Sequence, residues 1–301
     1  MPDSTQNTFS QISAALTEQV TAARGLVAEI RLRGHSPRSG TLWRKDVVVA
    51  SEQSLPDDAE AEVVLATGGR FAARIAGRDP GTNVAVLRLD GAPQPVVPPA
   101  VEPQPGALVL GLAADGAGGV AVRLGAVHSV GPAWHSRAGG RIDRRVGLDI
   151  RMDRGEEGGP VLDAAGGLLG ISTLGPRRRV LAIPAATVER VLEPLLTTGR
   201  VARGWLGAAV QPVLVPETLQ TEAGQSLGLM IVGVSKDSPA VQAGILMGDI
   251  LIGVDGVGVG NPSQLAELLG SESVGRSVQL RLIRAGKVQE FAATVGARPA
   301  R

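Results

Sequence analysis

Two adjacent carboxylates, Glu156 and Glu157 in the segment RGEEGGPVLD, have the clearest capacity for acid–base chemistry. Paired carboxylates can act as acid and base when their surroundings push their pKa values apart. Adjacent residues on a turn usually point apart, however, and Arg151 and Arg154 are close enough in sequence to neutralise both charges. We therefore interpret this segment as a solvated charged loop rather than a new catalytic pair.

The chain offers few other groups for nucleophilic, redox or metal chemistry. It contains no cysteine, which excludes disulfides, thiolate chemistry and cysteine-ligated metals. Its three histidines, His35, His128 and His135, show no His-x-x-x-His spacing, so we expect neither a metal site nor a cofactor. His128 and His135 fall in GAVHSVGPAWHS, and we interpret them as loop or partly buried residues rather than displaced bases.

Charge and composition argue against phosphate, nucleic-acid and membrane functions. The glycine-rich stretch GLAADGAGG (111–119) lacks the Gly-Lys-Ser/Thr of a phosphate-binding loop and opens no helix, so we do not expect it to bind phosphate. The formal charge is +1, and Tyr is absent beside three Trp and three Phe, so nucleic-acid binding is not expected. No uncharged apolar run reaches the ~18–20 residues that a membrane span needs.

Length and composition indicate a soluble chain with two domains. The 301 residues suffice for two domains of roughly 150 residues each. Apolar residues make up 44% and charged residues 20%, which is an ordinary balance for a protein with a buried core. The N-terminal segment MPDSTQNTFSQISAALTEQV has neither a basic region nor an apolar core like those of a signal peptide. On that ground the cytoplasm is the expected location.

Periodicity predicts one helix and then many short strands in the first two thirds of the chain. Apolar residues recur at helical spacing over about 8–24, at Phe9, Ile12, Leu16 and Val20. From Gly25 to about residue 183, short apolar runs are broken by Gly, Pro and Asp, and AEVVLATGGRFAARIAG has the pattern of a hairpin. Such a series favours an antiparallel sandwich or barrel.

Two further helices are predicted. IPAATVERVLEPLLTTG is helical by pattern, although we expect Pro194 to kink or break it. A smaller unit over about 204–297 carries apolar strands and one helix, with Asn261 as its cap, Pro262 in its first turn and Gly270 after its end.

Five segments, in their order along the chain, resemble one known family. They are SGTLWRKDVVVA (39–50), GRFAARIAGRDPGTNVAVLRLD (69–90), RGEEGGPVLDAAGGLLGIST (154–173), VLAIPAATVERVLEPLLTTGRVARGWLG (180–207) and SPAVQAGILMGDILIGVDG (238–256). They are similar to the HtrA/Deg proteins, in which a chymotrypsin-like serine protease domain precedes a PDZ domain. The resemblance implies a mainly β fold of two six-stranded antiparallel β-barrels followed by a PDZ domain. It divides the chain into an N-terminal helix (1–24), a trypsin-like protease-type domain (25–198), a linker (199–203) and a PDZ domain (204–297).

The resemblance also identifies the positions of the family's catalytic triad, and none holds the family's residue. Gln53 falls where the family's His follows a short apolar strand, Asn83 replaces the Asp, and Glu157 replaces the Ser of Gly-Asn-Ser-Gly-Gly-Pro. An amide cannot act as a general base near pH 7, and a carboxylate is a poor nucleophile toward a peptide bond. Gly155 and Gly158 remain as a vestigial oxyanion loop.

A peptide-binding site is implied in the second domain. PDZ domains hold a peptide beside an exposed strand and bind its C-terminal carboxylate through backbone N–H groups of a tight loop. The matching loop is Trp205-Leu206-Gly207-Ala208. We expect Leu265, on the facing helix, to line the groove.

The leading prediction is an HtrA-like pseudoprotease that binds polypeptide segments or protein C-termini, with an active protease relative as a further partner. Two alternatives stay open: an active serine endopeptidase or hydrolase with a rearranged site, and a structural subunit of a larger assembly. The family commonly trimerises through N-terminal aromatic residues and works in the cell envelope. This N-terminus offers only Phe9, so a homo-oligomer also stays open.

Overall fold

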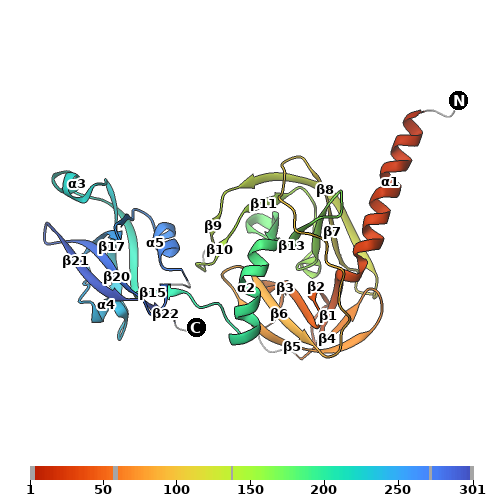
Figure 1. The fold of residues 1–301 in the computed structure, drawn as a ribbon, viewed down its shortest axis with the longest axis horizontal. Helices are drawn as coiled ribbons and strands as arrows, with labels where there is room; N and C mark the ends of the chain where they lie inside the picture. Colours follow the sequence, from red (N-terminus) through yellow and green to blue (C-terminus); the bar gives the residue numbers. More distant parts are fainter. Residues whose placement is uncertain (1–3, 57–59, 137, 271–272, 299–301) are drawn as a thin grey trace. The chain divides into compact units, whose positions relative to one another are not determined.

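The computed structural model describes residues 4–56, 60–136, 138–270 and 273–298. The chain divides into two compact units, Met1–Arg200 and Val201–Arg301 (Figure 1). The first unit opens with helix α1 (Ser4–Ala23), followed by a 3₁₀ turn at Arg24–Leu26. The helix predicted over 8–24 is therefore confirmed, and it begins four residues earlier.

Six strands close into the first barrel in the order β1-β2-β3-β6-β5-β4. Their bounds are β1 (Val27–Leu32), β2 (Arg38–Arg44), β3 (Val47–Ser51), β4 (Ala61–Leu65), β5 (Arg70–Asp79) and β6 (Val84–Leu89). The predicted hairpin is the β4–β5 pair, which turns at Gly68 and Gly69.

Six further strands close into the second barrel in the order β11-β14-β13-β12-β7-β8. Their bounds are β7 (Leu108–Ala114), β8 (Val120–Gly131), β11 (Arg145–Leu148), β12 (Pro160–Asp163), β13 (Leu168–Leu174) and β14 (Val180–Pro184). A small hairpin of β9 (Trp134–His135) and β10 (Arg141–Ile142) lies outside the barrel sheet. The strands of both barrels pair antiparallel to one another, which confirms the predicted pair of six-stranded barrels.

Each barrel encloses an apolar core made by the inward-facing side of its strands. Ile30 and Leu87 are fully buried in the first barrel, and Val109 and Val161 in the second. Full burial of one such side chain stabilises the fold by about 1.5–3 kcal/mol. All five residues of β3 are buried because β3 also contacts β13 of the second barrel. The two barrels therefore meet where β3 contacts β13, and also where β1 and β2 contact β7.

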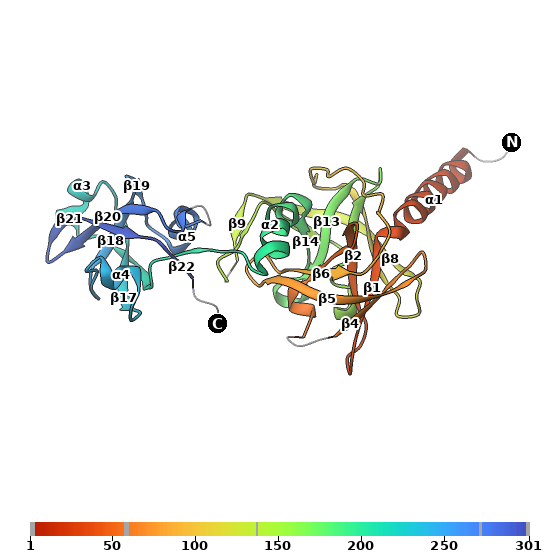
Figure 2. The ribbon, with the colours of Figure 1, turned by 60° about the horizontal axis from the view of Figure 1, so that its bottom comes forward.

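Helix α2 (Ala185–Thr198) packs against both barrels, on β5 and β6 of the first and β13 and β14 of the second (Figure 2). Contrary to expectation, the helix continues through Pro194. Its apolar face buries Val188, Val191, Leu192 and Leu195. That burial outweighs the one backbone hydrogen bond that proline removes.

The second unit is built on the sheet β16-β17-β18-β20-β21, in which β16 is an edge strand. Its strands are β15 (Gly204–Trp205), β16 (Ala208–Leu214), β17 (Leu227–Val234), β18 (Ile250–Val254), β19 (Val257–Gly258), β20 (Ser277–Arg284), β21 (Lys287–Thr294) and β22 (Gly296–Ala297). Its helices are α3 (Glu217–Ala223), α4 (Pro239–Gln242) and α5 (Pro262–Leu268). The predicted cap of α5 is confirmed, since the Asn261 side chain accepts from the Gln264 amide at 3.0 Å.

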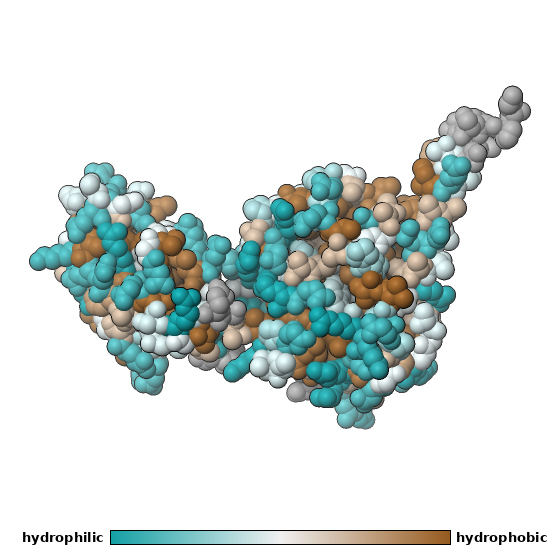
Figure 3. Space-filling model, viewed as in Figure 1, coloured by the Kyte–Doolittle hydropathy of each residue, from teal (hydrophilic) through white to brown (hydrophobic). Residues whose placement is uncertain are grey.

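In the described part of the chain, no helix combines the length and apolar character needed to cross a membrane. The face shown in Figure 3 mixes hydrophilic and hydrophobic residues over both units.

Candidate functional site

Three segments bring Gln53, Asn83 and Glu157 together where the two barrels meet. Gln53 lies in a 3₁₀ turn, Glu52–Ser54, directly after β3. Asn83 ends the turn between β5 and β6, and Glu157 precedes β12. The backbone amide of Gln53 donates to the Asn83 side-chain oxygen at 2.8 Å, and Gln53 Nε2 donates to Glu157 Oε2 at 2.6 Å. The three predicted triad positions are therefore linked by direct hydrogen bonds.

The Glu157 carboxylate is the centre of this network. It is 3% exposed, and Oε2 accepts from four donors. They are Gln53 Nε2 (2.6 Å), Thr173 Oγ1 (3.1 Å), the Leu174 amide (3.1 Å) and Ser51 Oγ (3.2 Å). A buried carboxylate needs such partners because an uncompensated charge in the interior is costly. Glu157 is thus held in place by polar groups from both barrels.

Asn83 also belongs to this hydrogen-bond network, through its side-chain amide. Its Nδ2 donates to Thr173 Oγ1 at 2.7 Å and to Ser51 Oγ at 3.1 Å. Its backbone φ of 59° lies in the left-handed region, which Asn tolerates better than most residues. The Asp79 side chain fixes the turn that leads there, by accepting from the Gly81 amide at 3.0 Å and the Thr82 hydroxyl at 2.7 Å.

The predicted solvated loop at 156–157 is wrong, because both carboxylates are buried. Glu156 is 8% exposed and pairs with Arg123 of β8 at 2.7 Å, rather than with Arg151 or Arg154. It also accepts from the Asp153 amide at 2.8 Å. The two carboxylates point to different partners, so they do not form an acid–base pair. The barrel brings in Arg123 from 33 residues away, which sequence proximity cannot reveal.

The segment predicted to be a vestigial oxyanion loop contains a 3₁₀ turn over Arg154–Glu156, which includes Gly155. Gly158 has a φ of +94°, and a Cβ there would lie 2.6 Å from the Ser39 carbonyl oxygen, so the position requires glycine. Its amide donates to the Ser172 carbonyl at 2.8 Å. The Gly158 N–H group therefore already donates a hydrogen bond within the second barrel.

No imidazole appears among the hydrogen bonds described above for Gln53, Asn83 and Glu157. Across the described ranges, no group of three His, Cys, Asp or Glu side chains could hold a metal ion.

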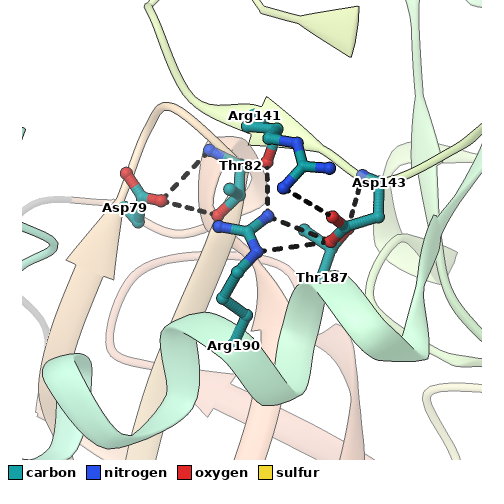
Figure 4. Close-up of polar contacts among 6 residues, drawn as sticks. All are labelled: Asp79, Thr82, Arg141, Asp143, Thr187 and Arg190. Atoms are coloured by element: carbon teal, nitrogen blue, oxygen red, sulfur yellow. Dashed lines mark hydrogen bonds and ion pairs between the residues drawn. The ribbon is translucent and has the colours of Figure 1, made fainter. Parts of the chain in front are cut away.

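A second polar cluster anchors the β9–β10 hairpin to α2 beside the Asn83 turn (Figure 4). Asp143 accepts from the Thr187 hydroxyl at 2.8 Å and from Arg190 Nη2 at 3.0 Å, while Arg141 lies 3.6 Å away. Burial alone would raise the Asp143 pKa, but the hydrogen bonds from Thr187 and Arg190 outweigh it and lower the pKa. The ionised form is therefore favoured in the folded state.

This shift gives a pH-dependent contribution to stability. Because the folded-state pKa of Asp143 is lowered, its stabilisation is present above the unfolded-state value and is lost as pH falls through the folded-state value. We expect Asp143→Asn to reduce the free energy of unfolding by about 1–2 kcal/mol at pH 7, and this difference to disappear under strongly acidic conditions. Urea titrations at several pH values measure it, with the exposed Asp90→Asn as control. A difference that does not change with pH would contradict the assignment.

The second unit contains a groove between the edge strand β16 and helix α5. An apolar pocket of about 200 Å³ lies there, and its lining includes all five predicted peptide-binding residues: Trp205, Leu206, Gly207, Ala208 and Leu265. Gly207 has a φ of +81°, and a Cβ there would lie 2.2 Å from the Ser238 side chain. The structure thus brings the predicted loop and the predicted helix residue to one pocket, beside a strand edge free for pairing. Sequence reasoning missed Arg298, which also lines this pocket.

Two protein families match the chain, in the order that the two units have. Residues 38–171 match the trypsin-like peptidase domain, and residues 204–295 match the PDZ domain. A probable periplasmic serine endoprotease, DegP-like, of Brucella suis is 29% identical over 272 residues, which cover 87% of this chain and 52% of the relative. The DegP-like relative of Rhizobium meliloti is 27% identical, covering 92% of this chain and 56% of its own length. The chain thus spans about half the length of these curated relatives.

Solved structures agree over nearly the whole chain. The HtrA-type protease AlgW with a tripeptide has a TM-score of 0.78 and 25% identity, covering 95% of this chain and 98% of that one. The serine endoprotease from Yersinia pestis has a TM-score of 0.78 at 24% identity, with 94% and 98% covered.

Proposed function

Since this chain belongs to the HtrA family of trypsin-like proteases with a PDZ domain, we propose that it is a non-catalytic member that binds polypeptide segments. The observation that supports loss of catalysis is the hydrogen bond between Gln53 and Glu157, at positions that we equate with the family's His and Ser. A Gln–Glu pair cannot perform the steps of the family's reaction. Gln53 has no nitrogen that accepts a proton near neutral pH, and Glu157 has no hydroxyl to activate.

Ser51 favours the competing candidate, an active hydrolase with a rearranged site. Its hydroxyl lies 3.2 Å from Glu157 Oε2, so a nucleophile and a carboxylate are adjacent. Ser51 is 0% exposed, however, and its hydroxyl contacts Asn83 and Thr173 as well. A substrate carbonyl cannot reach a fully buried hydroxyl without displacing these residues. A carboxylate is also a much weaker base than an imidazole.

We expect the purified chain neither to hydrolyse casein nor to react with a fluorophosphonate probe, because neither reaction has an activated serine here. Trypsin at equal concentration is the positive control. Intact mass spectrometry measures covalent labelling, and the release of labelled casein fragments measures hydrolysis. Stoichiometric labelling, or hydrolysis that disappears in Glu157→Ala or Ser51→Ala, would overturn the proposal of a non-catalytic protein.

The binding function is assigned to the PDZ groove. The observations that support it are the apolar pocket between β16 and α5 and the edge position of β16. A C-terminal residue would fill the pocket, its carboxylate would meet the loop at Gly207, and its backbone would pair with β16. The similar HtrA-type protease AlgW was solved with a tripeptide.

The proposed partners are protein C-termini, and the compartment that we propose differs from the cytoplasm expected from the sequence. The curated relatives are named periplasmic, and that name gives no support to a cytoplasmic location. A cell-envelope location is therefore part of the proposal. Fractionation of the source cells, with detection of this chain in each fraction, decides between the two compartments.

A further inference from the structure

A pocket of about 370 Å³ lies beside Glu157 and is lined by three arginines. Arg38 begins strand β2, Arg154 lies in the 3₁₀ turn before Glu157, and Arg178 lies in a second 3₁₀ turn, Pro176–Arg178. Three segments that are distant in sequence therefore direct guanidinium groups into one concave site.

The three guanidinium groups are only weakly neutralised. Arg38 donates to backbone carbonyls, including that of Ser54 at 2.9 Å, which fix its position and leave its charge uncompensated. Arg154 has neither a hydrogen bond nor an ion pair with any described residue. Arg178 lies 3.7 Å from Asp153, and both side chains are largely exposed, at 68% and 81%. Exposed ion pairs of this kind are weak, so Asp153 neutralises Arg178 only weakly.

The carboxylates near the pocket cancel this charge only in part. Glu157 lines the pocket, but its Oε2 is already occupied by four donors, and Glu156 is paired with Arg123 outside it. Three arginines against Glu157 and Asp153 leave a net charge of +1. The exposed residues Arg151, Arg177 and Arg179 flank this region in sequence and raise its positive potential further.

We propose that this pocket binds the carboxylate side chains of an acidic polypeptide segment. The inference rests on the proposed loss of catalysis, because an active cleft would cleave the bound chain. Arginine presents a planar fork of donors that matches a carboxylate in two parallel hydrogen bonds. Arg154, which has no partner, supplies such a fork. Leu174 and Gly175, at the end of β13, also line the pocket.

A polypeptide fits this site better than a nucleic acid. No aromatic side chain lines the pocket, so there is no platform on which a base could stack. The chain as a whole carries a formal charge of only +1, which gives no extended basic surface for a phosphate backbone. The positive charge is local, at the scale of one or two acidic side chains.

The test uses the full chain and a peptide of alternating Glu and Gly that is acetylated at its N-terminus and amidated at its C-terminus. Amidation removes the carboxylate that the PDZ loop would hold, so the measurement isolates the arginine pocket. By isothermal titration calorimetry we expect the Glu peptide to bind at least about tenfold more tightly than the matching Gln peptide. Its affinity should fall as salt is raised.

A pair of double variants tests the residues. Arg154→Gln with Arg178→Gln should weaken binding of the Glu peptide about tenfold, since it removes two of the three guanidinium groups. The control is Arg33→Gln with Arg74→Gln, which makes the same change of net charge at exposed positions of the first barrel. The control should bind the Glu peptide within about twofold of the unmodified chain. Circular dichroism verifies that both variants are folded.

The outcomes separate this inference from the proposed function. Equal affinity for the Glu and Gln peptides, equal loss in the two double variants, or tighter binding of a uridine oligonucleotide would each overturn the acidic-peptide site. Mass spectrometry of the peptide after incubation reports on catalysis. A cleaved peptide overturns the proposed function, whereas an intact peptide that does not bind overturns only this inference.

Discussion

Gln53→His, Asn83→Asp and Glu157→Ser, introduced together, are expected to produce measurable peptide hydrolysis, whereas Glu157→Ser alone stays inactive. A serine without a base is a weak nucleophile, so the single change supplies a hydroxyl that nothing activates. The triple variant restores a nucleophile, a base and the carboxylate that orients the base. Because triad members act as a unit, the expected gain over the single variant is about 10³-fold or more.

The geometry of the site favours acceptance of an Asp at position 83. The Asn83 side-chain oxygen already accepts from the amide of residue 53 at 2.8 Å, and an Asp carboxylate would keep that bond. Asn83 Nδ2 now donates to the hydroxyls of Ser51 and Thr173. Hydroxyl groups rotate and can donate instead, so an Asp at position 83 would meet three donors without movement of the backbone.

Two measurements check this prediction: hydrolysis of casein, and covalent labelling by a fluorophosphonate probe. The double variant Gln53→His with Asn83→Asp serves as the matched control, because it carries the base and its orienting group without the nucleophile. Cleavage by Glu157→Ser alone would show that the base lies elsewhere. A folded triple variant that neither cleaves nor labels would refute our placement of the three triad positions.

Much of the fold follows from local patterns in the sequence. Short apolar runs between glycines and prolines predicted the strands, and the Asn261-Pro262 pair predicted the start of α5. The convergence of Gln53, Asn83 and Glu157 came from the family resemblance, because no local pattern places residues 104 positions apart in contact. Helix α2 shows that a local pattern can also mislead. Pro194 predicts a kink or a break, but the helix continues through it because burial of its apolar face outweighs the lost backbone hydrogen bond.

The residues that contact Glu156 and Glu157 could not be predicted from the sequence. Ser51 and Thr173 look like ordinary strand residues, yet both touch Glu157 because β3 and β13 meet between the barrels. Arg123 is likewise found only through the pairing of β8 in the second barrel. The expectation of solvated carboxylates failed because it considered only charges nearby in sequence, whereas a barrel brings together side chains from distant strands.

Capture of a free C-terminus should be lost when the apolar groove of the second unit is blocked. We expect peptides that end in an aliphatic or aromatic residue to bind with roughly micromolar affinity, because a short flexible peptide loses conformational entropy on binding. Amidating the C-terminus should weaken binding by about 1–3 kcal/mol, the usual range for a charge-assisted hydrogen bond. The length of peptide that can pair with the edge strand β16 is limited, because Pro212 in that strand has no N–H group to donate.

Two groove variants test the position of the bound side chain. Leu265→Arg puts a charged side chain into the pocket, but Leu265 is only 9% exposed and packs in the core, so this change also threatens folding. Ala266→Glu is the safer variant, because Ala266 lines the same pocket and is only partly buried. Its carboxylate would repel the peptide carboxylate and occupy apolar space. Met247→Glu, at a side chain that is 69% exposed outside the pocket, is the matched control because it adds the same negative charge.

Titration of a C-terminal peptide library against the full chain, in free-acid and amidated forms, provides the measurement. We expect free acids to bind, amides to bind about 5- to 150-fold more weakly, and Ala266→Glu to abolish binding while Met247→Glu retains it. Equal binding of acids and amides would show that the loop at Gly207 holds no carboxylate. If no peptide binds the folded chain, the groove is not a peptide site, and the hypothesis of a structural subunit becomes the better account of this PDZ domain.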